Sequence, residues 1–260
     1  MSYSTPTPTS LRYQQHPHRN LSFLLCILLL SLGGLASAVP LPQQFTAVYA
    51  VKKNGLTIGE TKRTLRRNGD YFQFESITRP KGVARLFTSG QVVERSLWDF
   101  FQGLPRPLKY TYFNSGRKKK RNVQLDFDWQ KRQVINTING EPWKMPLEYG
   151  TQDKLLYQLR IMQDLPTDQP RLRYPIADGG KLKYYDIEVM GTERIRTELG
   201  VFDAVRLRYI KGSRKTTMWC ARQLSYLPVR IEQQKNNDSP VRAILTSVTG
   251  ISPRNLATVR

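Results

Sequence analysis

Apolar and polar residues alternate in short runs over most of the chain beyond residue 44. In the first run, FTAVYAVKK, the residues Phe45, Ala47, Tyr49 and Val51 fall on one face of an extended strand, because successive side chains of a strand point to opposite faces. Asn-Gly pairs, which favour tight hairpin turns, follow such runs at residues 54–55, 68–69 and 139–140. The ranges that predict strands are 45–53, 59–67, 70–78, 90–100, 108–114, 122–129, 133–139, 181–191, 191–199, 203–210, 215–221, 227–234 and 241–248.

A series of short strands at this spacing predicts a mainly β protein with a single antiparallel barrel-like or curled β-sheet domain. One segment departs from the alternation. In TQDKLLYQLRIMQDLP, residues 151–166, Leu155, Leu156, Leu159 and Met162 recur at helical spacing, Thr151 or Asp153 is available as an N-terminal cap, and Pro166 blocks extension. We expect one short amphipathic helix that packs on the sheet or plugs one end of it. A helix on a membrane surface is the alternative.

The N-terminal residues have the order of a secretory signal. Two arginines, Arg12 and Arg19, precede the apolar run LSFLLCILLLSLGGL at residues 21–35, and the small-residue sequence ASA follows at residues 36–38. The run is shorter than the ~20 apolar residues of a membrane span. We expect cleavage after Ala38, which would leave residues 39–260 as a single β-rich domain in the periplasm with no integral membrane span. An uncleaved anchor is the alternative.

Cleavage would remove most of the residues that could carry catalysis. His16, His18 and Cys26 all precede residue 39, so the remaining chain would have no histidine and one cysteine, Cys220. Cysteine–histidine and serine–histidine pairs and zinc sites built from these residues are then excluded. We therefore expect no catalytic residue, no metal site and no cofactor. Cys220, beside Trp219, is interpreted as a small buried side chain, with a reactive free thiol as the alternative.

The chain is strongly basic, with 41 Lys and Arg against 20 Asp and Glu. The predicted leader contains two of these arginines and no acid, so its loss lowers the formal charge only from +21 to +19. Such an excess in a cytoplasmic protein would favour nucleic acid as a partner. An exported protein does not meet nucleic acid. The expected partners are instead anionic lipid, lipopolysaccharide or another envelope protein.

Basic residues repeat in the C-terminal half as four basic-x-basic pairs. Because residues i and i+2 of a strand share a face, each pair should point one way while its apolar middle residue points to the core. If the strands are neighbours, the pairs would form one cationic face that binds an anionic ligand. Solvation of an outer face is the alternative. The candidate residues are Arg171, Arg173, Lys181, Lys183, Arg194, Arg196, Arg206 and Arg208.

Carboxylates offer weaker candidates. Asp126 and Asp128 share one side of a strand and could bind a cation or act as an acid–base pair, although both could equally face solvent while Leu125 and Phe127 point inward. Glu94 and Glu193 could form buried ion pairs with arginine. The glycines of DGGK, residues 178–181, indicate a turn, because a phosphate-binding loop is longer and precedes a helix.

Several of these segments together resemble a known family. GETKRTL, ERSLWDF, PLKYTYF, LDFDW, TQDKLLYQLR, GTERIRTELG, DAVRLRY and WCARQLSYLPVRIE are similar to the bacterial exported proteins of domain of unknown function 3108, over roughly residues 45–248. The resemblance implies a mainly β envelope protein without an assigned activity, so it carries no catalytic residues to this chain.

These observations favour a soluble, exported, non-enzymatic protein of the envelope that binds an amphiphile or an anionic envelope component. Two alternatives are a histidine-free, carboxylate-dependent hydrolase of an envelope polymer and a scaffold that binds another envelope protein along a sheet edge. An interior cavity lined by Leu, Phe and Tyr would favour the amphiphile, two facing carboxylates the hydrolase, and an unpaired sheet edge the scaffold.

Overall fold

The computed structural model describes residues 1–3, 41–86, 90–116 and 121–251. Within these residues fourteen antiparallel strands form one curled sheet, accompanied by one short α-helix, so the predicted fold class is confirmed. All of these elements belong to the unit Ala38–Arg260. Apart from residues 1–3, the predicted leader lies outside the described residues.

The bounds of the elements follow from the alternation of buried and exposed positions. The strands are β1 (Phe45–Lys53), β2 (Leu56–Asn68), β3 (Tyr71–Pro80), β4 (Val92–Phe101), β5 (Leu104–Asn114), β6 (Arg121–Asp128), β7 (Gln133–Ile138), β8 (Glu141–Pro146), β9 (Arg171–Asp178), β10 (Lys181–Thr197), β11 (Gly200–Lys211), β12 (Arg214–Ala221), β13 (Leu227–Lys235) and β14 (Val241–Thr249). The helix α1 spans Tyr157–Asp164, and short 3₁₀ turns lie at Gly82–Leu86, Leu165–Thr167 and Arg222–Leu224.

The sheet begins and ends at two proline-containing strands. Its order is β8-β7-β6-β5-β4-β3-β2-β1-β14-β13-β12-β11-β10-β9, so β1 pairs with β14 and the edges are β8 and β9. Because proline cannot donate to the hydrogen-bond ladder, it occurs mainly in edge strands, at strand ends and at bulges. In the interior strands, Pro107 and Pro228 stand at register shifts. Pro142 and Pro146 in β8 and Pro175 in β9 fit this rule. Neither edge strand is among the ranges predicted above, because the prolines weaken the strand pattern.

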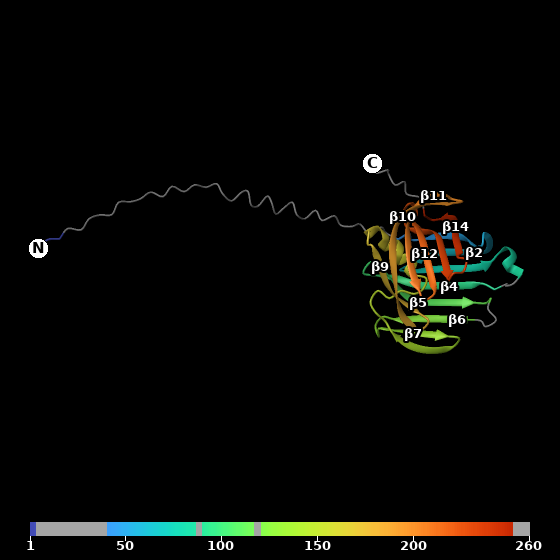
Figure 1. Cartoon of the computed structure of the whole chain (residues 1–260). Coiled ribbons are helices and arrows are strands. Elements are labelled where there is room, and N and C mark those ends of the chain that lie inside the picture. Colours follow the sequence, from blue (N-terminus) through green and yellow to red (C-terminus); the bar gives the residue numbers. More distant parts are fainter. Residues whose placement is uncertain (4–40, 87–89, 117–120, 252–260) are drawn as a thin grey trace. The chain divides into compact units, whose positions relative to one another are not determined.

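The curl brings the two edges together, and Figure 1 shows β10 and β12 running across the direction of β4 and β5. Gln152, just after β8, forms a parallel bridge with β9: its N–H donates to the Pro175 carbonyl at 2.8 Å and its carbonyl accepts from Ala177 N–H at 2.9 Å. Trp143 Nε1 donates to the Gly180 carbonyl at 3.2 Å. A Cβ on Gly180 would lie 2.0 Å from the Trp143 ring, so this approach requires glycine.

The predicted amphipathic helix is confirmed, although it begins only at Tyr157. Asp153 caps the turn that precedes it, because its Oδ1 accepts the N–H groups of Leu155 and Leu156 at 2.8 and 2.7 Å. The helix buries Leu159 and Ile161 and lies against β5 and β9. In the described part of the chain no helix has the length and apolar character needed to cross a membrane.

Most of the buried apolar residues of the described chain form two hydrophobic clusters. One contains Trp98, Tyr49 and Leu125, and the other contains Ile187, Leu207 and Cys220. The interpretation of Cys220 as a buried side chain is confirmed, because it is fully buried and has no disulfide partner among the described residues. Burial in this apolar cluster raises the pKa of the Cys220 thiol far above its ordinary value.

Cys220 should therefore react slowly with thiol reagents in the folded protein and rapidly in denaturant. Cys220→Ser should lower the free energy of unfolding by about 1–3 kcal/mol, because it buries a hydroxyl in an apolar cluster. Timed thiol labelling and urea denaturation measure the two effects. A native thiol that reacts as fast as a free cysteine would contradict the buried position.

Candidate ligand-binding cavity

A cavity of about 640 Å³ lies on the concave side of the curled sheet. Its wall is built by strands far apart in the sequence, namely β2, β4–β6 and β9–β13, together with the first turn of α1. We call the face of the sheet that bears Tyr185 and Tyr209, which line the cavity, the inner face, and the opposite side the outer face. The volume lies within the range of ~300–1,000 Å³ that is usual for small-molecule sites.

The wall of the cavity is polar and carries an excess of positive charge. Six basic side chains line it, against two carboxylates, Glu94 and Asp178. Five tyrosines contribute ring surface and hydroxyl groups. The basic residues are Arg63, Arg121, Lys154, Lys211, Arg214 and Lys235, and the tyrosines are Tyr110, Tyr112, Tyr157, Tyr185 and Tyr209.

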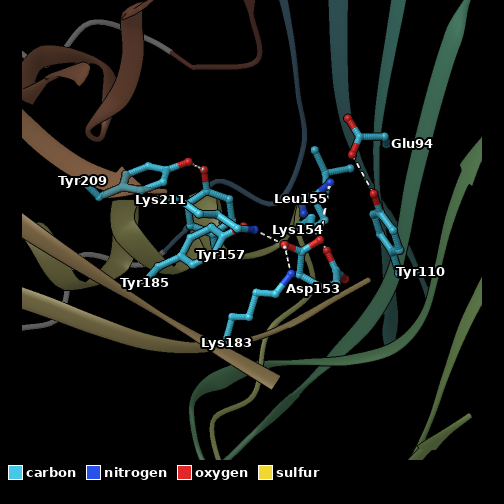
Figure 2. Close-up of polar contacts among 11 residues, drawn as sticks. Glu94, Tyr110, Asp153, Lys154, Leu155, Tyr157, Lys183, Tyr185, Tyr209 and Lys211 are labelled. Carbon is cyan, nitrogen blue, oxygen red and sulfur yellow. Dashed lines mark hydrogen bonds and ion pairs between the residues drawn. The ribbon is translucent and has the colours of Figure 1, made fainter. Parts of the chain in front are cut away.

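The carboxylate of Asp178, at the end of β9, interacts with three lysine side chains. This carboxylate lies 3.8 Å from Lys154 Nζ and 3.3 Å from Lys183 Nζ, and it also accepts a hydrogen bond from Lys211. Figure 2 shows Lys183 and Lys211 converging on one point. Burial acts to raise the pKa of Asp178, but the hydrogen bond from Lys211 and the charges of the three lysines outweigh it and hold the pKa below its ordinary value. One ionised carboxylate thus balances part of the charge of three cations.

Three tyrosines form one side of the cavity (Figure 2). The hydroxyl groups of Tyr157 and Tyr209 lie 3.1 Å apart, and the rings of Tyr185 and Tyr209 stack with centroids 5.1 Å apart. Lys211 Nζ donates to the Tyr185 hydroxyl at 3.0 Å. Burial raises the pKa of Tyr157 well above the ordinary value of a phenol, so its hydroxyl stays protonated and can donate a hydrogen bond to an anion.

A second group of polar residues lies beyond Lys154. The Tyr110 hydroxyl donates to Glu94 Oε1 at 2.6 Å, and Ser96 Oγ donates to Asp153 Oδ2 at 2.5 Å. Burial raises the pKa of Asp153 to about 6, although the hydrogen bonds from Ser96, Leu156 and Leu155 act to lower it. Figure 2 shows the Glu94–Tyr110 pair on the far side of Asp153 from the tyrosine group.

Arg63 enters the cavity from β2. Its guanidinium lies over the Tyr49 ring, 5.1 Å from the centroid, and donates to Gln158 Oε1 at 2.6 Å. Within the described residues, Arg63 forms no ion pair, and its Nε has no hydrogen-bond partner. The Oγ1 of Thr216, which also lines the cavity, is likewise without a partner. The cavity therefore holds a cation that no protein carboxylate neutralises.

The prediction of a single cationic face is wrong, because its four pairs lie on both faces of neighbouring strands. Directly opposed residues of antiparallel strands share a face. Lys181 is opposite Asp178 and Lys183 is opposite Ile176, in phase with Tyr185, so this pair lies on the inner face. Its middle residue, Leu182, stands opposite Ala177 and packs against the hydrophobic cluster that contains Leu125.

A bulge in β10 changes the phase of the next pair. The pairing with β11 shifts between Val189 and Thr192, so that Arg194 stands opposite Asp203. Arg194 and Arg196 consequently lie on the same side of β11 as Leu207, which belongs to the inner face. A bulge that inserts one extra residue reverses the alternation beyond it, and the sequence of β10 gives no clear sign of its position.

The other two pairs lie on the outer face, where acidic residues of β10 meet them. Arg173 pairs with Asp186 at 3.5 Å, Arg208 pairs with Glu188 at 2.7 Å, and Arg206 pairs with Glu193. Arg171 stands opposite Glu188. A role for these eight residues in ligand binding stays a prediction, but only Lys183 among them reaches the lysine group around Asp178.

The carboxylate candidates take structural positions. Asp126 and Asp128 point away from buried Leu125 and Phe127 and pair with Lys109 and Lys131. Glu193 does pair with an arginine, Arg206, but both side chains are more than a third exposed. Residues 178–181 form the β9–β10 turn, as predicted. The described residues include no group of three or more His, Cys, Asp or Glu side chains that could hold a metal ion.

Sequence reasoning missed most of the cavity residues, although a local signal exists. On β11 the inner-face phase continues from Leu207 through Tyr209 to Lys211, and on β10 it runs from Ile187 through Tyr185 to Lys183. Apolar residues thus give way to tyrosine and then lysine along one face of each strand. This succession indicates an interior that becomes polar, but it does not reveal which strands meet there.

Comparison with known proteins supports the fold and leaves the activity open. A family model described as a protein of unknown function, DUF3108, matches residues 44–246. The chain is also similar to the crystal structure of a β-barrel-like protein of domain of unknown function DUF1849 from Brucella abortus, with a TM-score of 0.56 and 10% sequence identity, over 82% of this chain and 99% of that chain. No curated protein matches the chain.

Proposed function

The chain belongs to the DUF3108 family, whose description assigns no activity, and we propose from its cavity that it is a non-enzymatic binding protein of the bacterial envelope that holds an anionic small molecule. The observation that carries this proposal is the composition of the cavity wall, with six basic side chains, five tyrosines and two carboxylates around about 640 Å³. A site with this balance attracts negative charge.

The types of side chain in the cavity wall define the class of ligand more closely than the excess of positive charge does. Tyrosine rings provide flat apolar surface and their hydroxyl groups donate hydrogen bonds, while lysine and arginine bind phosphate and carboxylate. A wall made of leucine and phenylalanine would instead favour an acyl chain. We therefore assign to this cavity a phosphate- or carboxylate-bearing molecule, such as the charged portion of an envelope lipid or of lipopolysaccharide.

Both carboxylates of the cavity are engaged by protein groups, which favours binding over hydrolysis. Asp178 balances Lys154, Lys183 and Lys211, and Glu94 accepts the Tyr110 hydrogen bond. A carboxylate-dependent hydrolase needs one carboxyl group that is free to act as an acid and a second that acts as base or nucleophile. Ion pairing of Asp178 with lysines opposes the first role, because it keeps the carboxyl group ionised.

Calorimetric titration with inositol hexakisphosphate, and with inositol as its uncharged control, tests the proposal. We expect saturable binding of the anion at one site, weakened as salt shortens the Debye length to ~8 Å at physiological ionic strength, and no binding of inositol. Equal binding of both compounds, or no saturable binding of the anion at low salt, would contradict an anion site.

The envelope location rests on the predicted leader and has its own test. Protein recovered from bacterial cells should begin at Val39, because cleavage is expected after Ala38. N-terminal sequencing or intact-mass measurement checks this prediction. Recovery of a chain that still begins at residue 1 would contradict export by cleavage, but would leave the anion site of the folded domain open to the titration above.

A further inference from the structure

A second pocket, different in chemistry from the cavity, lies at the turn end of β4–β7. Its volume is about 400 Å³, and it forms where the β4–β5 turn, the β6–β7 turn and the segment 147–152 meet. Most of its lining is apolar, with Leu104, Pro105, Trp129 and Leu147 in its wall. Phe101 and Tyr149, which also line it, remain 43% and 60% exposed, so large apolar rings face water at its mouth.

The pocket has one cation without a protein counter-charge. Two arginines line it, Arg106 and Arg132. Arg106 donates to both oxygens of Asp99, at 2.8 and 2.5 Å, and lies over the Phe101 ring. For Arg132, by contrast, no carboxylate lies within ion-pair distance among the described residues, and its side chain is exposed.

The pocket and the cavity have no lining residue in common, although one short segment contributes to both. Gly150, Thr151 and Gln152 line the pocket, whereas Lys154 lines the cavity. Between them, Asp153 is fully buried and hydrogen-bonded to Ser96. Ligands of the two sites are therefore separated by protein and can be tested independently.

We propose that this pocket binds the apolar chain of a single-chain anionic amphiphile, of the fatty-acid class, with its charged group at Arg132. A largely apolar wall with a small number of polar groups is the usual composition of a site for such a molecule. Burial of the chain removes the exposed faces of Phe101 and Tyr149 from water, and a negative head group supplies the charge that Arg132 lacks. This site goes beyond the proposed anion cavity and does not depend on it.

Trp129 provides a direct probe, because it lines the pocket and its Nε1 is fixed by a hydrogen bond of 2.7 Å to the Pro107 carbonyl. A fatty acid brominated on its chain should quench tryptophan fluorescence in a saturable manner. Trp129→Phe should remove most of this quenching while calorimetry still detects binding. The matched variant Trp143→Phe, at the contact between the sheet edges, should leave the quenching intact.

Charge selectivity provides the second measurement. Arg132→Ala should weaken the binding of dodecanoate by about tenfold, as expected for the loss of one charged contact, and should not change the binding of dodecanol. Arg63→Met with Lys211→Met, which alters the cavity, should not change dodecanoate binding. The binding of dodecanoate is therefore expected even if the cavity does not bind inositol hexakisphosphate.

The source of the ligand is distinguished by a parallel experiment with vesicles of phosphatidylglycerol that carry brominated chains. Quenching by both the free acid and the vesicles supports a chain taken from the membrane, and quenching by the free acid alone supports a soluble amphiphile. The proposal is overturned if neither quenches, if Trp129→Phe retains the full quenching, or if the cavity variant abolishes dodecanoate binding.

Discussion

Replacing Arg63 and Lys211 together by methionine is expected to lower the affinity for inositol hexakisphosphate by about a thousandfold. Both residues reach the cavity from opposite parts of the sheet, on β2 and β11. A unit charge ~8 Å from an anion contributes about 2 kcal/mol at an effective dielectric constant of ~20, and each ~1.4 kcal/mol is a tenfold change in affinity. Methionine retains the apolar stem of each side chain, so packing is largely preserved.

The matched control removes two charges from β11, the strand of Lys211, but from its other face. Arg206→Met with Arg208→Met changes the net charge by the same amount and disrupts only the partly exposed pairs with Glu193 and Glu188, which contribute little to stability. We expect the affinity of this variant to stay within a few-fold of wild type. An equal loss in both variants would mean that the anion responds to overall charge and not to the cavity.

Asp178→Asn should change the affinity in the opposite direction. The substitution removes the carboxylate that Lys154, Lys183 and Lys211 share, so their charges become available to a ligand. We expect tighter binding of the anion and lower stability of the ligand-free protein, because three cations then repel one another. Calorimetry and thermal unfolding with and without the anion measure both changes, and weaker binding by a folded variant would contradict this role of Asp178.

Stability should depend on pH through Asp153. Its pKa is about 6 in the folded protein, raised chiefly by burial, against an ordinary value of 3.8. The folded state therefore holds the proton more tightly than the unfolded state. Its contribution to stability is fully present below pH ~4 and is lost as the pH rises through ~6. A difference of about two pKa units corresponds to ~3 kcal/mol in the free energy of unfolding.

Asp153→Asn separates this contribution from other titrating groups. The asparagine oxygen can still accept the N–H groups of Leu155 and Leu156, as Asp153 Oδ1 does, but it has no proton to lose. We expect the stability of wild type relative to this variant to fall by ~3 kcal/mol between pH ~4 and pH ~7, measured by urea denaturation. A constant difference between wild type and Asp153→Asn would contradict the raised pKa.

The strands, hairpin turns and helix could be predicted from the sequence, because each depends on residues that are close together along the chain. Alternation located twelve of the fourteen described strands, two of the predicted ranges being parts of the long strand β10, and the Asn-Gly pairs marked three hairpin turns. The spacing of Leu155, Leu159 and Met162 revealed the helix. Each of these signals lies within a few residues, where hydrophobic period and turn chemistry act directly.

The cavity could not be predicted, because its residues meet only through long-range pairing. Arg63 and Lys211 come together because β1 pairs with β14 and the sheet then curls, and neither event has a local signature. The bulge between Val189 and Thr192 shows the same limit. One extra residue there reverses the faces of all that follow in β10, so Arg194 and Arg196 lie on the opposite face from Arg206 and Arg208.

The most direct test of the central claim is native mass spectrometry of the protein purified from its own cells at low salt. The account predicts a bound anionic small molecule on the wild-type protein and on the Arg206→Met, Arg208→Met variant, released by high salt and absent from the Arg63→Met, Lys211→Met variant. A ligand retained equally by all three proteins, or a wild-type protein that carries no ligand and binds no added anion, would contradict it.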